Sequence, residues 1–68
     1  MEKYLKIYNE GFSDGLVDAY KDFIKNKEKK LFVDDKEFIS KLYDLSYIYG
    51  YNLFCNILKM HLLIDEKL

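Results

Sequence analysis

The stretch Gly11-Phe12-Ser13-Asp14-Gly15-Leu16-Val17-Asp18-Ala19 decides the fold, because small residues recur in it at every fourth position of a helical pattern. Glycine inside a helix costs about 1 kcal/mol relative to alanine, so both glycines need a compensating contact. Close approach of a second helix backbone supplies one. A later segment repeats this spacing of small residues. We therefore predict a helix crossing made by Gly11, Gly15 and Ala19 of the first segment and Ser46 and Gly50 of the second.

Apolar residues repeat at three- and four-residue steps over two long segments, which predicts two amphipathic helices. The first helix is expected at about 2–27, the second at about 35–65, and a connector at 28–33. Asp34 and Glu37 form a capping box at the start of the second helix, and Val33 packs on Phe38 as a hydrophobic staple. The expected fold is all-α, a two-helix hairpin that forms one domain over 1–68.

The second helix is apolar on nearly all sides, and a helix of that kind is buried on nearly all sides. A chain of 68 residues has little core with which to cover it. Its single cysteine, Cys55, cannot form an intrachain disulfide that would stabilise the fold. We therefore predict a homodimer or higher oligomer, built as a four-helix-type bundle. The predicted oligomer interface consists of Tyr47, Tyr51, Phe54, Leu58 and Leu62.

Four carboxylates, Glu10, Asp14, Asp18 and Asp22, follow one another at four-residue steps along one side of the first helix. Like charges at this spacing repel each other. The ridge is either a solvated face or a surface presented to a basic partner protein in imitation of DNA phosphates. The formal net charge of −1 gives no reason to expect direct binding of nucleic acid or of an anionic membrane.

The sequence contains no pattern typical of an enzyme or of a cofactor site. Carboxylate-bridged metal sites in helix bundles use Glu-x-x-His units, and His61 has no acidic residue three positions before it. A glycine-rich phosphate loop and a Ser/His/Asp set are also absent from the sequence. We expect a protein that is not an enzyme and that has no cofactor and no metal.

The pattern Tyr-x-x-Gly-[Phe/Tyr] occurs twice, at residues 8–12 and 47–51, and resembles one found in short helical proteins of Gram-positive phages. The lack of Pro, Trp, Arg, Thr and Gln is typical of AT-rich coding sequences of low-GC bacteria and their phages. We expect a non-catalytic, cytoplasmic interaction protein, encoded by a phage or mobile element. It would inhibit or regulate a host protein that acts in defence or on nucleic acid.

Two other functions stay open. An oligomer could sequester a small ligand, such as a nucleotide, between tyrosines at its interface (Tyr43, Tyr47, Tyr49 and Tyr51). The apolar segment 45–64 could instead associate with a membrane, although inserting a lysine such as Lys59 costs about 2.5–3.5 kcal/mol. No signal peptide opens the sequence, so export is not expected.

Overall fold

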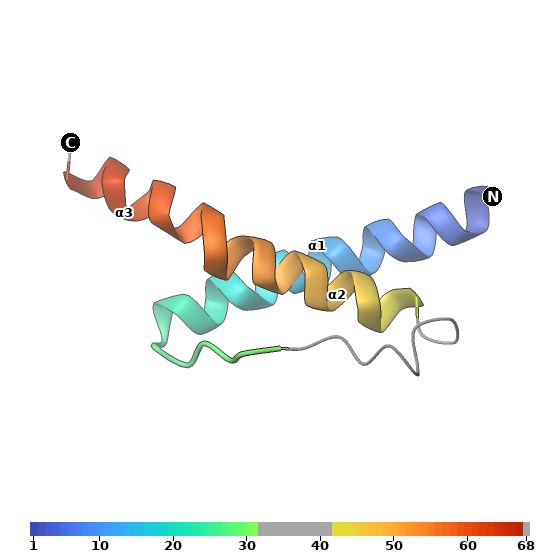
Figure 1. Cartoon of the computed structure of the whole chain (residues 1–68), viewed down its shortest axis with the longest axis horizontal. Helices are drawn as coiled ribbons and strands as arrows, with labels where there is room; N and C mark the ends of the chain where they lie inside the picture. The colour runs from blue at the N-terminus through green and yellow to red at the C-terminus, as the bar shows by residue number, and fades with distance from the viewer. Residues whose placement is uncertain (32–41, 68) are drawn as a thin grey trace.

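The computed structural model describes residues 1–31 and 42–67 of the chain. The helical segments are α1 (Glu2–Ile24), α2 (Leu42–Leu53), the π-helical η2 (Phe54–Leu58) and α3 (Lys59–Lys67). The last three follow one another without a break and form one long helix, which crosses α1 (Figure 1). The prediction of an all-α fold with two helices packed against each other is confirmed for the described residues.

The first helix ends at Ile24, three residues before the predicted end at 27. Asn26 has a φ of 57°, a left-handed conformation that asparagine adopts more easily than most residues. The backbone N–H of Asn26 donates to the carbonyl of Phe23 (3.2 Å), and that of Lys27 donates to the carbonyl of Asp22 (2.7 Å). These two bonds form a Schellman motif, so an asparagine ends α1 where neither glycine nor proline is present.

The predicted start of the second helix lies outside the described residues. The capping box of Asp34 and Glu37 and the staple of Val33 on Phe38 both fall within 32–41. The described part of the second helix begins at Leu42.

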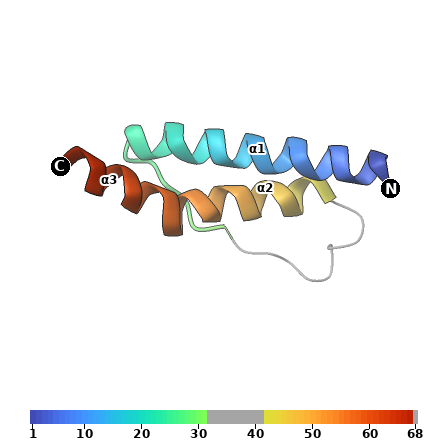
Figure 2. The ribbon, with the colours of Figure 1, turned by 90° about the horizontal axis from the view of Figure 1, so that it is seen from above.

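The two packed helices run in the same direction. Asp14, Asp18 and Asp22 of α1 accept hydrogen bonds from tyrosines of α2 that are always 29 residues further along the chain. A constant separation means that both helices advance together, as Figure 2 also shows. Residues 28–31 run beside the second helix in the direction opposite to it, because Glu28 contacts Lys59 and the later Leu31 contacts Asn52.

The helix backbones touch where the small residues lie. A Cβ atom added to Gly15 would come closer than 3.0 Å to the carbonyl oxygen of Tyr47 and would lie 2.9 Å from the backbone nitrogen of Tyr51. A Cβ atom on Gly50 would come closer than 3.0 Å to the carbonyl oxygen of Phe12. Backbone atoms cannot rotate away as a side chain can. Glycine is therefore required here for close approach, although its backbone is ordinary helix.

The other residues of the predicted crossing lie in the same contact. Ala19 and Ser46 are both completely buried. The Ser46 hydroxyl donates a hydrogen bond to the carbonyl oxygen of Tyr43 (2.9 Å), so burial leaves this polar group paired. A Cβ atom on Gly11 would collide with that hydroxyl and with the Tyr43 carbonyl oxygen. All five small residues thus belong to one helix crossing.

The core forms beyond this crossing, where aromatic side chains of both helices meet. Phe54 contacts Phe23 and Tyr20 edge to face, with ring centroids 5.8 and 5.9 Å apart. Tyr51 and Phe54 are only 1% and 5% exposed within a single chain. The predicted oligomer interface is therefore wrong at these two positions, because α1 already covers them. Leu58 and Leu62 remain 37% and 38% exposed, and Tyr47 is half-buried.

We expect Gly15→Ala to lower the free energy of unfolding by about 1–3 kcal/mol, because the added methyl group collides with backbone atoms of α2. Helix propensity alone predicts a gain of about 1 kcal/mol. Urea unfolding followed by circular dichroism measures the change. Ser13→Ala is the matched control, because Ser13 is exposed on the same helix. A Gly15→Ala protein at least as stable as the wild type would show that the crossing is looser than described.

Candidate functional site

One side of the crossing carries three matched pairs of tyrosine and aspartate, which we name the ladder. The Tyr47 hydroxyl donates to Asp18 Oδ2 at 2.6 Å, and the Tyr51 hydroxyl donates to Asp22 Oδ2 at 2.7 Å. The third pair is Tyr43, whose hydroxyl donates to Asp14 Oδ2. The tyrosines on α2 and the aspartates on α1 both recur at every fourth residue. Parallel helices with this common spacing bring every pair into register once one pair is aligned.

The ladder changes the interpretation of the acidic ridge. Three of its four carboxylates, Asp14, Asp18 and Asp22, accept hydrogen bonds from α2, while Glu10 is exposed. Hydrogen bonds to ionised groups are stronger than neutral ones, so they offset the repulsion between neighbouring aspartates. Three of the four carboxylates of the ridge thus contact α2 within the chain, and they keep their negative charge.

The ladder raises the pKa of its tyrosines. The hydrogen bond to Asp14, followed by burial, raises the pKa of Tyr43 to about 12. Burial is the largest cause for Tyr51, where it acts with the hydrogen bond to Asp22 to raise the pKa to about 12. Burial and the hydrogen bond to Asp18 hold the pKa of Tyr47 well above its ordinary value. All three hydroxyls therefore remain hydrogen-bond donors at a higher pH than an ordinary tyrosine does.

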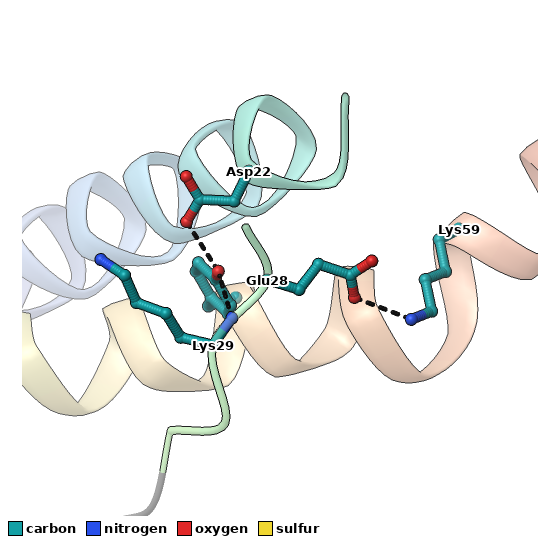
Figure 3. Close-up of polar contacts among 5 residues, drawn as sticks. Asp22, Glu28, Lys29 and Lys59 are labelled. Atoms are coloured by element: carbon teal, nitrogen blue, oxygen red, sulfur yellow. Dashed lines mark hydrogen bonds and ion pairs between the residues drawn. The ribbon is translucent and has the colours of Figure 1, made fainter. Parts of the chain in front are cut away.

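The Tyr51–Asp22 pair of the ladder also contacts the segment that follows α1, residues 28–31 (Figure 3). The backbone N–H of Lys29 donates to the Tyr51 hydroxyl oxygen at 3.0 Å, so this hydroxyl accepts one hydrogen bond and donates another. Lys59 Nζ lies 2.7 Å from Glu28 Oε2. Asn52 Nδ2 donates to the carbonyl oxygen of Leu31 at 3.0 Å. These bonds fasten residues 28–31 to the second helix.

Cys55 lies in the π-helical turn beside this fastening and is half-buried. Burial, followed by the neighbouring Glu28, raises the pKa of its thiol. A nucleophilic cysteine needs a lowered pKa, so this environment opposes thiolate chemistry. His61 is exposed. Cys55 therefore acts as a small apolar residue in the packing.

Residues 1–31 and 42–67 contain no group of three or more His, Cys, Asp and Glu side chains placed to hold a metal ion. Within the same residues, no helix combines the length and the apolarity that crossing a membrane requires.

The side of the crossing opposite the ladder is apolar. On α1 the ladder aspartates stand one position before the crossing residues, so the residues one position after them, Phe12, Leu16 and Tyr20, lie on the opposite side. On α2 the order is reversed, and Tyr49 precedes Gly50 on that same side. We name this surface the open face. It consists of seven residues before the end of the π-helical turn: Leu5, Phe12, Leu16, Tyr20, Tyr49, Leu53 and Ile57.

The open face is only partly covered by the chain itself. Phe12, Leu16 and Leu53 are half-buried, and the other four side chains are exposed. None of the seven side chains is charged. The periodicity of the second helix predicted a surplus of apolar surface, but that surplus lies mainly here and on α3, away from Tyr51 and Phe54.

We expect Tyr47→Phe to destabilise the protein by about 1 kcal/mol, because it removes a hydrogen bond to an ionised carboxylate at a half-buried site. Asp18→Asn tests the other partner, and the double variant closes a thermodynamic cycle. The expected coupling between the two residues is about 1 kcal/mol, measured by urea unfolding. The same cycle for Tyr47 and Glu10, which the structure does not pair, is the control and is expected to give no coupling. Equal coupling in both cycles would contradict a specific ladder bond.

Raising the pH should weaken the fold through the ladder. A tyrosine whose pKa is about 12 in the folded state and 10.0 in the unfolded chain binds its proton more tightly when folded. Its stabilisation is therefore complete below pH 10 and is lost as the pH rises toward 12. We expect the urea midpoint to fall over this range, and to fall less in the Tyr43→Phe/Tyr51→Phe variant. Tyr4→Phe, at an exposed residue, is the control. If the urea midpoint fell equally with pH in the double variant and in the wild type, the ladder would not be the cause of the alkaline loss of stability.

No protein-family model, curated protein or solved structure matches this chain. Its function must therefore be inferred from its own structural features. These are three tyrosine–aspartate hydrogen bonds, a segment at 28–31 that is bound to the second helix, and an uncharged apolar face.

Proposed function

We propose that this chain is a non-catalytic interaction protein that works as a homodimer with a four-helix core and binds another protein. The open face is the observation that carries the proposal. Only one helix packs against the second helix within the described residues, and beside their crossing Tyr20, Tyr49 and Ile57 stay 47%, 43% and 49% exposed. Protein domains are stable when apolar faces of their elements cover each other. An apolar face that the chain leaves exposed is therefore expected to bind something.

The role expected from the sequence is compatible with this proposal. We propose that the bound protein belongs to a host cell and that a phage or mobile element encodes this chain as its inhibitor or regulator. The acidic ridge is no longer the surface we propose for that contact, because three of its carboxylates are hydrogen-bonded within the chain.

For the host protein we propose the C-terminal helix α3 as the contact. This helix extends past the end of α1 and diverges from it (Figure 1). It exposes Met60, Leu62, Leu63 and Ile64, which are spread around the helix axis. Helices of this kind bind in apolar grooves of other proteins. Charge steering by the ridge is not needed for such a contact.

Sequestration of a nucleotide between tyrosines has no specific support. Tyr43, Tyr47 and Tyr51 already donate their hydroxyls to carboxylates. A row of aspartates beside them repels phosphate groups. We therefore do not propose a ligand-binding role.

A photo-cross-linking amino acid at Leu63 tests the contact with a host protein. The full chain, expressed at low level in a low-GC bacterium, is expected to give a discrete adduct with one host protein. The same probe at Tyr43, on the ladder side, is the control and is expected to give none. Leu62→Glu should reduce the Leu63 adduct by about tenfold or more, because a charge is placed in an apolar contact. Equal labelling of many proteins from both positions would contradict a specific partner.

A further inference from the structure

We infer that Asp22 and Tyr51 form a latch that holds residues 28–31 against the second helix. When the Tyr51 hydroxyl is lost, this segment opens as a unit while the helix crossing stays packed. The latch is a conformational device within one chain, so it does not depend on the proposed partner or on the proposed homodimer.

The hydrogen bonds of Asp22 and Tyr51 close a ring around the end of α1. The backbone N–H of Lys27 donates to the Asp22 carbonyl oxygen at 2.7 Å. The backbone N–H of Lys29 donates to the Tyr51 hydroxyl oxygen at 3.0 Å, and that hydroxyl donates to Asp22 Oδ2 at 2.7 Å. Asp22 therefore holds the turn with its main chain and orients the acceptor for Lys29 with its side chain. A hydroxyl that donates to a carboxylate is also a better acceptor, because linked hydrogen bonds polarise one another.

The bond from Lys29 links the two ends of the segment. On one side Glu28 pairs with Lys59, and on the other the Leu31 carbonyl oxygen accepts from Asn52 while its side chain packs against the core. The side chains of Glu28 and Lys29 point in opposite directions along the second helix (Figure 3). Because these contacts lie within four consecutive residues, release at Lys29 is expected to loosen those on both sides of it.

The segment and the helix crossing differ in burial, so they are expected to open separately. Residues 28–30 are exposed, and a cleft lined by Asn52, Cys55 and Asn56 separates the segment from the second helix. Exposed ion pairs contribute little to stability. Ala19 and Ser46 of the crossing are completely buried. Regions held by exposed polar contacts open locally while a buried core stays folded.

The thiol of Cys55 reports opening of the segment. Cys55 is the only cysteine of the chain and lies in the wall of the cleft that residues 28–31 close. The neighbouring Glu28 raises the pKa of this thiol, so release of the segment both uncovers Cys55 and removes a group that lowers its reactivity. The rate of reaction with a maleimide therefore measures the open population.

Tyr51→Phe and Tyr47→Phe form a matched pair for this measurement. Each loses one hydroxyl that donates to an aspartate of α1, but only the Tyr51 hydroxyl also accepts from Lys29. We expect Tyr51→Phe to raise the labelling rate of Cys55 about fivefold, as for loss of one hydrogen bond, with the helix content unchanged by circular dichroism. Tyr47→Phe should leave the rate within about twofold of the wild type. An equal rise in both variants, or no rise in Tyr51→Phe, would overturn the latch.

Hydrogen exchange of the wild-type chain tests the latch without a substitution. In low urea the amide of Lys29 should exchange faster than that of Gly50, and its rate should depend little on urea, because local opening exposes little surface. The Gly50 amide lies at the crossing and should show the steeper dependence of global unfolding. Equal rates and equal urea dependence at the two amides would show that the segment opens only when the whole chain unfolds, which contradicts the latch.

Discussion

The rest of the structure depends on the contact between the two helix backbones at the small residues. At Gly15 and Gly50 each helix lies so close to the other that a methyl group would meet backbone atoms of the opposite helix. Such a contact fixes the rotation of both helices and the level at which they cross, because no side chain can adjust to a different arrangement. Dispersion contacts between the two backbones thus offset the low helix propensity of glycine.

The ladder is a consequence of that crossing. Once the small residues fix the level of the helices, positions 14, 18 and 22 lie opposite positions 43, 47 and 51. Aspartates at four-residue steps would repel each other in an isolated helix. Here each one accepts a hydrogen bond from a tyrosine of α2, and the raised pKa of these tyrosines extends the pairing into the alkaline range. The same residues that look like a binding surface in the sequence therefore connect the two helices.

Helical periodicity and the cost of glycine were sufficient to predict two packed helices and to single out their small residues. The predicted end of α1, at about 27, lies three residues past Ile24, and Asn26 is the signal that places it, because asparagine tolerates the left-handed conformation of a Schellman motif. The ladder could not be predicted, since it depends on the level at which the helices cross and on their common direction. Tyr51 and Phe54 were assigned to a second copy because periodicity shows that a helix side is apolar but does not show which element covers it.

The common direction of α1 and the second helix has an electrostatic consequence. Peptide dipoles add along a helix, and in antiparallel pairs they cancel between neighbours. Here they reinforce each other, so partial positive charge accumulates at the end where α1 begins and partial negative charge at the end where it stops. The sequence places Lys25, Lys27, Lys29 and Lys30 immediately after the last turn of α1. A cation next to the last turn of a helix stabilises its partial negative charge, so Lys25, at the C-cap of α1, is favourably placed.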